Sequence, residues 1–137
     1  MKIKLLLALA LAAFVLPSRA ADAMDEKQFQ KLMKEVGGIS KKFRDNAQAK
    51  NSAAVEKDAA RTAEIYKQMA GFWKARKTDD AARMSEDSAS AATATAAAAK
   101  AGEWDKVKTH WGAVGKSCKD CHEKHREKLE DGSYKIK

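Results

Sequence analysis

The sequence predicts an all-α fold, an antiparallel four-helix bundle. Its 137 residues are enough for one small domain. The chain has a single proline, Pro17, and is otherwise rich in alanine, lysine and glutamate, which favour helices. In four segments the apolar residues recur at alternating steps of three and four, the spacing of one helix face and of shallow helix crossings. The loops between these segments are short, so successive helices should run antiparallel.

The start of the chain has the three parts of a secretory signal peptide. Two lysines give a basic beginning, residues 5–16 are an unbroken apolar run of twelve, and Ser18 and Ala20 are small residues at the −3 and −1 positions. A membrane anchor is the alternative, but it needs about 20 apolar residues. We therefore expect residues 1–20 to be cleaved during export to the periplasm, leaving one domain of residues 21–137.

The net charge and the distribution of charged residues narrow the classes of molecule that the protein is expected to bind. Loss of Lys2, Lys4 and Arg19 lowers the formal net charge from +8 to +5 (8 − 3). The lysines alternate with acids along the predicted helices, which is typical of solvated faces, and we expect no nucleic-acid binding. A basic exported protein can meet anionic partner proteins. No other stretch is apolar enough for stable membrane insertion.

The first helix is predicted over about residues 25–46. Asp25 to Gln28 has the pattern of a capping box, and a single apolar stripe follows it. The stripe consists of Phe29, Leu32, Val36, Ile39 and Phe43. Gly37 and Gly38 interrupt the helix, which predicts either a bulky neighbour such as a cofactor, a kink, or close packing against another helix.

The next two helices are predicted over about 52–75 and 78–101. The second has a stripe running from Val55 to Trp73 with steps of four and three. The third contains only Ser, Ala and Thr over 88–99, so its inward face should be thin enough to lie close to a neighbour or a flat cofactor. A disordered low-complexity tract is the alternative.

The fourth helix is predicted over about 103–130, with a short basic tail after Asp131 and Gly132. Its stripe, beginning at Trp104, includes both cysteines of the chain, Cys118 and Cys121, followed by His122. Cys-x-x-Cys-His is the attachment signature of a c-type haem, in which the two thiols form thioethers and the histidine binds the iron. A thioredoxin-like motif, a zinc site and a plain disulfide are the alternatives.

Residues 103–107 and 112–126 resemble the C-terminal helix of class II c-type cytochromes, the cytochromes c′ and their low-spin c-556 relatives. The resemblance implies a four-helix bundle with one covalently bound haem c and an arginine, here Arg126, near the haem histidine. The family usually has an aromatic residue where this chain has His125. We expect His125 to be a half-buried helix residue, because the motif's own histidine normally binds the iron.

The first helix resembles the same family more weakly. This resemblance concerns the residue that would bind the haem iron as its second ligand, besides His122. Residues 29–34 are similar to the c-556 segment, which implies Met33 as the second iron ligand. Met33 also has a simpler interpretation as flexible core packing. Many cytochromes c′ carry a propionate-binding arginine where this chain has Phe29. Phe29, Trp73 and Arg126 are the expected haem-pocket residues.

Three functions follow from these expectations. The first is a periplasmic single-haem electron carrier with His122 and Met33 as ligands, acting on redox partner proteins. The second is a five-coordinate cytochrome c′ that binds NO or CO at an open site. The third is a haem-free helical bundle. No nucleophile–base signature occurs, so we do not expect an enzyme. A monomer and a homodimer are both compatible with the sequence.

Overall fold

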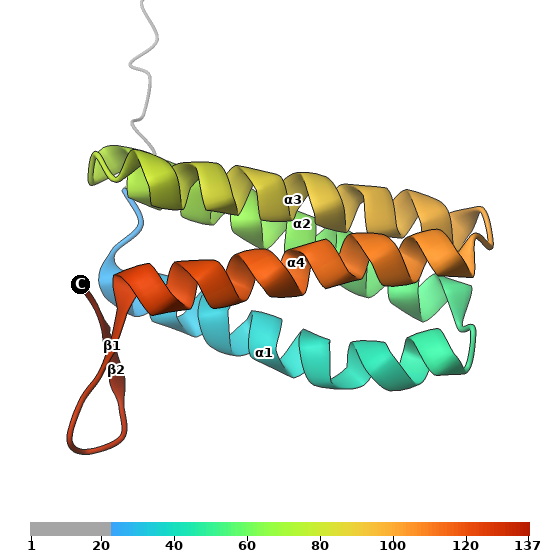
Figure 1. The fold of residues 1–137 in the computed structure, drawn as a ribbon, viewed down its shortest axis with the longest axis horizontal. Helices are drawn as coiled ribbons and strands as arrows, with labels where there is room; N and C mark the ends of the chain where they lie inside the picture. The colour runs from blue at the N-terminus through green and yellow to red at the C-terminus, as the bar shows by residue number, and fades with distance from the viewer. Residues whose placement is uncertain (1–22) are drawn as a thin grey trace, which may run out of the picture.

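The computed structural model describes residues 23–137, so the predicted signal peptide lies outside the described residues. The described part contains four helices followed by two short strands. In chain order these are α1 (Glu26–Gln48), α2 (Ser52–Ala75), α3 (Asp79–Lys100), α4 (Trp104–His125), β1 (Arg126–Lys128) and β2 (Tyr134–Ile136). Figure 1 shows the helices side by side along one axis, each running opposite to the one before it. The predicted all-α four-helix bundle is confirmed.

Helix α1 begins where the capping box predicted. The Gln28 backbone N–H donates to Asp25 Oδ1 over 2.7 Å, and the Asp25 N–H donates to Gln28 Oε1 over 3.2 Å. Phe29, Val36 and Phe43 are the buried positions of its apolar stripe. These residues lie seven apart, close to two helical turns, so one face of α1 packs on the bundle and the remainder is solvated.

Helix α3 packs closely against both α2 and α4, whereas α1 packs more loosely on α2. Its small side chains allow this close approach. The hydroxyl groups of Ser85, Ser88 and Thr95 are buried, and each donates to the carbonyl four residues earlier, over 2.8–2.9 Å. Because these groups are satisfied within α3, burying them leaves no unpaired polar atom. The thin inward face predicted from the alanine-rich sequence is therefore present.

The core consists of two clusters along the bundle axis. At one end, Phe43 of α1 stacks on Trp111 of α4, with ring centroids 3.7 Å apart and an interplanar angle of 6°. At the other end, Phe29, Phe72 and Trp73 form a second aromatic cluster. The second cluster lies beside the ends of the helices that carry the predicted site residues.

The end of α4 differs from the prediction. The helix stops at His125 rather than near residue 130, and the chain forms a β-hairpin instead of a basic tail. Residues 126–130 are mostly charged and would bury almost nothing as further helix, whereas the hairpin brings Ile136 against the core. The turn is formed by Gly132, with φ +82°, and by Ser133, whose N–H and hydroxyl both donate to Asp131 Oδ1.

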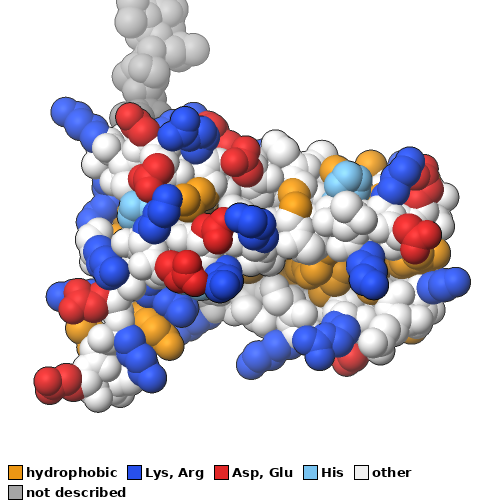
Figure 2. All heavy atoms as spheres, in the orientation of Figure 1, with side chains coloured by type: hydrophobic (Ala, Val, Ile, Leu, Met, Phe, Trp, Pro, Cys, Tyr) orange, Lys and Arg blue, Asp and Glu red, His pale blue; other side chains and the backbone are white. Residues whose placement is uncertain are grey.

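The surface is charged and mixed in sign. Figure 2 shows lysine and arginine side chains spread over this face among acidic ones, without a single basic patch. Among the ion pairs between helices, Arg61 of α2 donates to both oxygens of Glu35 in α1, over 2.7 and 3.1 Å. This arginine holds the pKa of Glu35 below its usual value. Within residues 23–137 no helix combines the length and apolarity that crossing a bilayer requires.

The fully buried Ile65 of α2 offers a test of the packing. Ile65→Ala should lower the free energy of unfolding by about 2–5 kcal/mol, because the lost methyl groups leave a cavity in close-packed core. Lys67→Ala, two residues away on the exposed face, should change it by less than about 0.5 kcal/mol. Urea unfolding of both variants measures the difference, and equal effects would contradict the assigned core.

Candidate functional site

A cavity of about 320 Å³ opens at the end of the bundle where α4 finishes. All four helices and the hairpin contribute to its mostly apolar wall. The lining residues include Phe29, Met33 and Gly37 of α1; Tyr66, Met69 and Trp73 of α2; Met84 of α3; Ser117, Cys118, Cys121, His122 and His125 of α4; and Arg126, Tyr134, Lys135 and Ile136 of the hairpin. The volume lies in the range of sites for small organic ligands and cofactors.

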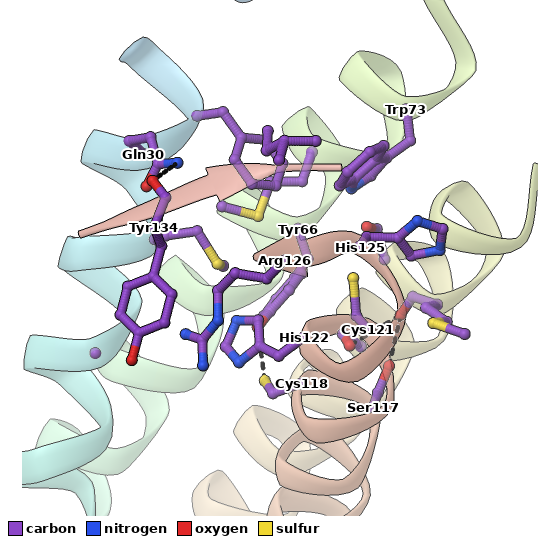
Figure 3. A pocket seen from close by; sticks show the side chains of 18 of the residues that line it. Gln30, Tyr66, Trp73, Ser117, Cys118, Cys121, His122, His125, Arg126 and Tyr134 are labelled. Atoms are coloured by element: carbon purple, nitrogen blue, oxygen red, sulfur yellow. Dashed lines mark hydrogen bonds between the residues drawn. The ribbon is translucent and has the colours of Figure 1, made fainter. Parts of the chain in front are cut away.

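The two cysteines lie on the same side of α4. Cys118 and Cys121 are one helical turn apart, so both thiols line the cavity, and both are free and half-buried. Figure 3 shows them with the imidazole of His122 close by. The hydroxyl of Tyr66, from α2, is hydrogen-bonded to the Cys118 sulfur over 2.8 Å. The contact joins residues that are 52 apart in the sequence and holds the Cys118 thiol against α2.

Burial sets the protonation of these groups. It raises the pKa of Cys118, and with smaller contributions from Cys118 and Asp80 it raises the pKa of Cys121 to about 11. Burial, followed by the charge of Cys118, also raises the pKa of the Tyr66 hydroxyl. The pKa of His122 is lowered by burial and then by the positive charge of Arg126. At neutral pH the thiols are therefore protonated and the imidazole is neutral, which leaves a nitrogen lone pair to bind a metal.

Helix α1 forms the opposite wall of the cavity. Phe29 is fixed by ring contacts with Phe72 and Trp73, at centroid distances of 4.6 and 5.3 Å. Met33, one turn further on, is half-buried and lines the cavity. Gly37 also lines the cavity, and a Cβ atom built there would meet no atom within 4 Å. Close helix packing therefore does not account for Gly37, and α1 continues through both glycines as regular helix.

His125 points away from His122 and is already paired. Its Nε2 lies 3.0 Å from Asp80 Oδ2 of α3, its side chain is 15% exposed, and its ring is 5.3 Å from that of Trp73. This hydrogen bond is the main reason that the pKa of Asp80 is lowered. His125 is thus the half-buried helix histidine expected from the sequence, held between α3 and the aromatic cluster.

The other interpretations of the cysteine motif fit the structure less well. Cys118 and Cys121 form no disulfide, and no three His, Cys, Asp or Glu side chains in the described part of the chain cluster as a metal site would require. A thioredoxin-like motif follows a strand, but β1 and β2 both come after α4.

Sequence reasoning missed several cavity residues. Tyr66 lies within the predicted stripe from Val55 to Trp73, but the spacing of that stripe gives no sign of its contact with Cys118. Ser117 donates its hydroxyl to the Met84 carbonyl over 2.9 Å and so fixes α3 against the cysteine-bearing turn. Only the preceding Asp-Gly pair indicates a turn before the hairpin residues Tyr134, Lys135 and Ile136. The charged residues on either side of that pair are typical of a solvated tail, so the sequence does not predict that the hairpin lines the cavity.

Comparison with known proteins agrees with this site. A family model described as Cytochrome C' matches residues 18–126, which include all four helices and end where β1 begins. No curated protein and no solved structure gives a match. Members of the matched family carry a covalently attached haem c, and an apolar cavity with two thiols and a neutral imidazole suits such a group. The chain therefore belongs to the cytochrome c′ family of c-type cytochromes.

Proposed function

We propose that this cytochrome is a periplasmic single-haem electron carrier. Cys118 and Cys121 form the two thioethers, and His122 and Met33 are the axial ligands. The haem iron supplies the chemistry by gaining or losing one electron. The protein's part is to hold the cofactor, exclude water from it and keep its ligands in place, so we propose no catalysed bond change.

The observation that carries the proposal is the grouping of two thiols, one neutral imidazole and a thioether sulfur around one apolar cavity. Cys118 and Cys121 face the cavity from successive turns of α4, and His122 follows directly. Cys118 is further oriented by Tyr66. The pocket residues Phe29, Trp73 and Arg126 line the same cavity and would contact the haem.

Three methionines line the cavity, and position favours Met33 as the ligand. Met84 lies beside the cysteines, since its carbonyl accepts the Ser117 hydroxyl, so it shares the wall that carries the attachment site. Met69 is 1% exposed and enclosed by the core. Met33 is half-buried and comes from α1, on the other side of the cavity from α4. A methionine opposite a histidine raises the reduction potential of the iron.

A second candidate function is supported by the family match, because cytochrome c′ is the printed description of the family. In this alternative Met33 only packs over the iron, which stays five-coordinate and binds NO or CO. The cavity residues are the same in both functions, so the difference lies in whether the Met33 sulfur bonds to the iron.

The surface suits reversible contacts with other proteins. The charge expected after removal of the signal peptide is positive before the two haem propionates are counted, which favours anionic redox partners. The mixed charges of Figure 2 suit brief association better than a permanent interface. Export fits the attachment of haem to thiols that an oxidising compartment would otherwise pair.

Replacement of Met33 distinguishes the two functions. The wild-type ferric protein should give a low-spin spectrum with a methionine–iron charge-transfer band. Met33→Ala should abolish that band, shift the iron to high spin and allow ready CO binding to the ferrous form. Met84→Ala, which removes another methionine from the same cavity, should leave the spectrum unchanged. A high-spin wild-type spectrum, unaltered by Met33→Ala, would establish the five-coordinate alternative.

Attachment through both cysteines is tested by mass. The mature protein should carry the added mass of one haem that survives denaturation, and the Cys118→Ala and Cys121→Ala variants should each retain it through one thioether. The double variant should release haem in acidified solvent. Protein of unmodified mass, produced in cells able to attach haem c, would mean that the chain is a haem-free bundle.

The raised thiol pKa values predict pH-dependent behaviour of the haem-free protein. Only the thiolate reacts with an alkylating reagent, so the reaction of folded apoprotein should accelerate up to a pH of about 11 for Cys121. The rate for the unfolded chain should be half-maximal near the ordinary thiol pKa of about 8.5 and level off above it. As the pH rises, the thiols of the unfolded state lose their protons before those of the folded state. The free energy of unfolding is therefore highest below about pH 8.5 and falls as the pH rises towards 11. Alkylation rates and urea midpoints measure both effects, and identical rates for folded and unfolded chains would contradict the buried site.

A further inference from the structure

The hairpin is an addition to the part of the chain that resembles the family. The family match ends at residue 126, whereas the hairpin extends to Ile136 and lines the cavity. It connects α4 with the beginning of α1. Gln30 Nε2 donates to the Tyr134 carbonyl and the Ile136 N–H donates to Glu26 Oε1, each over 3.3 Å. The hairpin is thereby held across the cavity end of the bundle.

One hairpin side chain contacts the arginine next to the haem motif. The ring of Tyr134 lies under the Arg126 guanidinium, with the Arg126 Cζ 4.0 Å from the ring centroid. Tyr134 is 41% exposed and is the exposed large hydrophobic residue of the described chain. A π face beneath a guanidinium attracts its charge and limits its freedom. The contact with Arg126 therefore explains why Tyr134, a large aromatic residue, occupies an exposed position.

The stack directs Arg126 towards the histidine of the motif. Figure 3 shows the guanidinium between the Tyr134 ring and the His122 imidazole. Arg126 makes no ion pair among residues 23–137, while the nearby acids Glu123 and Glu127 are paired with Lys119 and Lys135, at 3.7 and 3.3 Å. Within the described residues, no carboxylate therefore pairs with the Arg126 guanidinium and neutralises its charge.

We propose that Tyr134 is a positioning residue that holds the Arg126 guanidinium beside His122 and thereby raises the reduction potential of the bound iron. The inference rests on the proposed role of His122 as an axial ligand. A fixed positive charge near the iron favours the ferrous state, which carries one positive charge less than the ferric state. A guanidinium released into solvent has a weaker influence, because water screens it and its average distance increases.

The test compares three variants of the haem-loaded protein. Tyr134→Leu keeps an apolar strand residue but removes the π face, and it should lower the midpoint potential measured by spectroelectrochemistry. Tyr134→Phe keeps the π face and should restore the wild-type potential. Ser133→Ala alters the neighbouring turn without touching Arg126, and its potential should match the wild type. Hydrogen exchange of the β1 and β2 amides checks that the hairpin remains paired in each variant.

A double-mutant cycle separates positioning from general loosening of the site. Arg126→Gln should lower the potential, and Tyr134→Leu should have no further effect in that background. An unchanged potential in Tyr134→Leu, or an equal decrease with and without Arg126, would overturn the proposal. The role of His122 is tested separately by the wild-type spectrum, because a spectrum without the features of a histidine-ligated haem would overturn that role and this inference together, whereas a high-spin, five-coordinate spectrum would overturn only the role of Met33.

Discussion

The close packing of α3 is the constraint on which the rest of the structure depends. Its buried alanines, serines and threonines let α2 and α4 approach it, and the serine and threonine hydroxyls bond to carbonyls within the same helix. These three helices form a compact unit. Helix α1 completes the bundle more loosely, tied by the Arg61–Glu35 pair and by its aromatic residues. A bundle packed equally tightly on all sides would have no room for a flat cofactor.

The cavity follows from an uneven distribution of side-chain size along the bundle. At one end the stacked rings of Phe43 and Trp111 fill the space between α1 and α4. At the other end Gly37 supplies no side chain, and Phe29 packs onto Phe72 and Trp73 instead of crossing towards α4. The space left there is lined by Cys118, Cys121 and His122. The same sequence thus specifies a filled end and an open end.

Much of this arrangement could be predicted because it depends on local spacing. The stripes of apolar residues determine the four helices, and the three-residue spacing of Cys118 and Cys121 places both on one face of α4. Contacts between distant residues could not be predicted in this way. The Tyr66–Cys118 hydrogen bond depends on the relative positions of α2 and α4, and the hairpin depends on Ile136 finding a place against the core. Met33 is singled out by its resemblance to the c-556 segment, whereas only the structure shows that Met69 and Met84 line the same cavity.

The contact between the hairpin and α1 has a consequence for the order of assembly. Glu26 and Ile136 are 110 residues apart, so the hydrogen bond between them closes almost the whole described chain into a loop. Contacts among α2, α3 and α4 involve neighbours in sequence and cost less entropy to form. We therefore expect the contact between α1 and the hairpin, which closes the end of the cavity, to form last. Until that contact forms, the thiols of α4 remain accessible. Haem can therefore be attached before the site is enclosed.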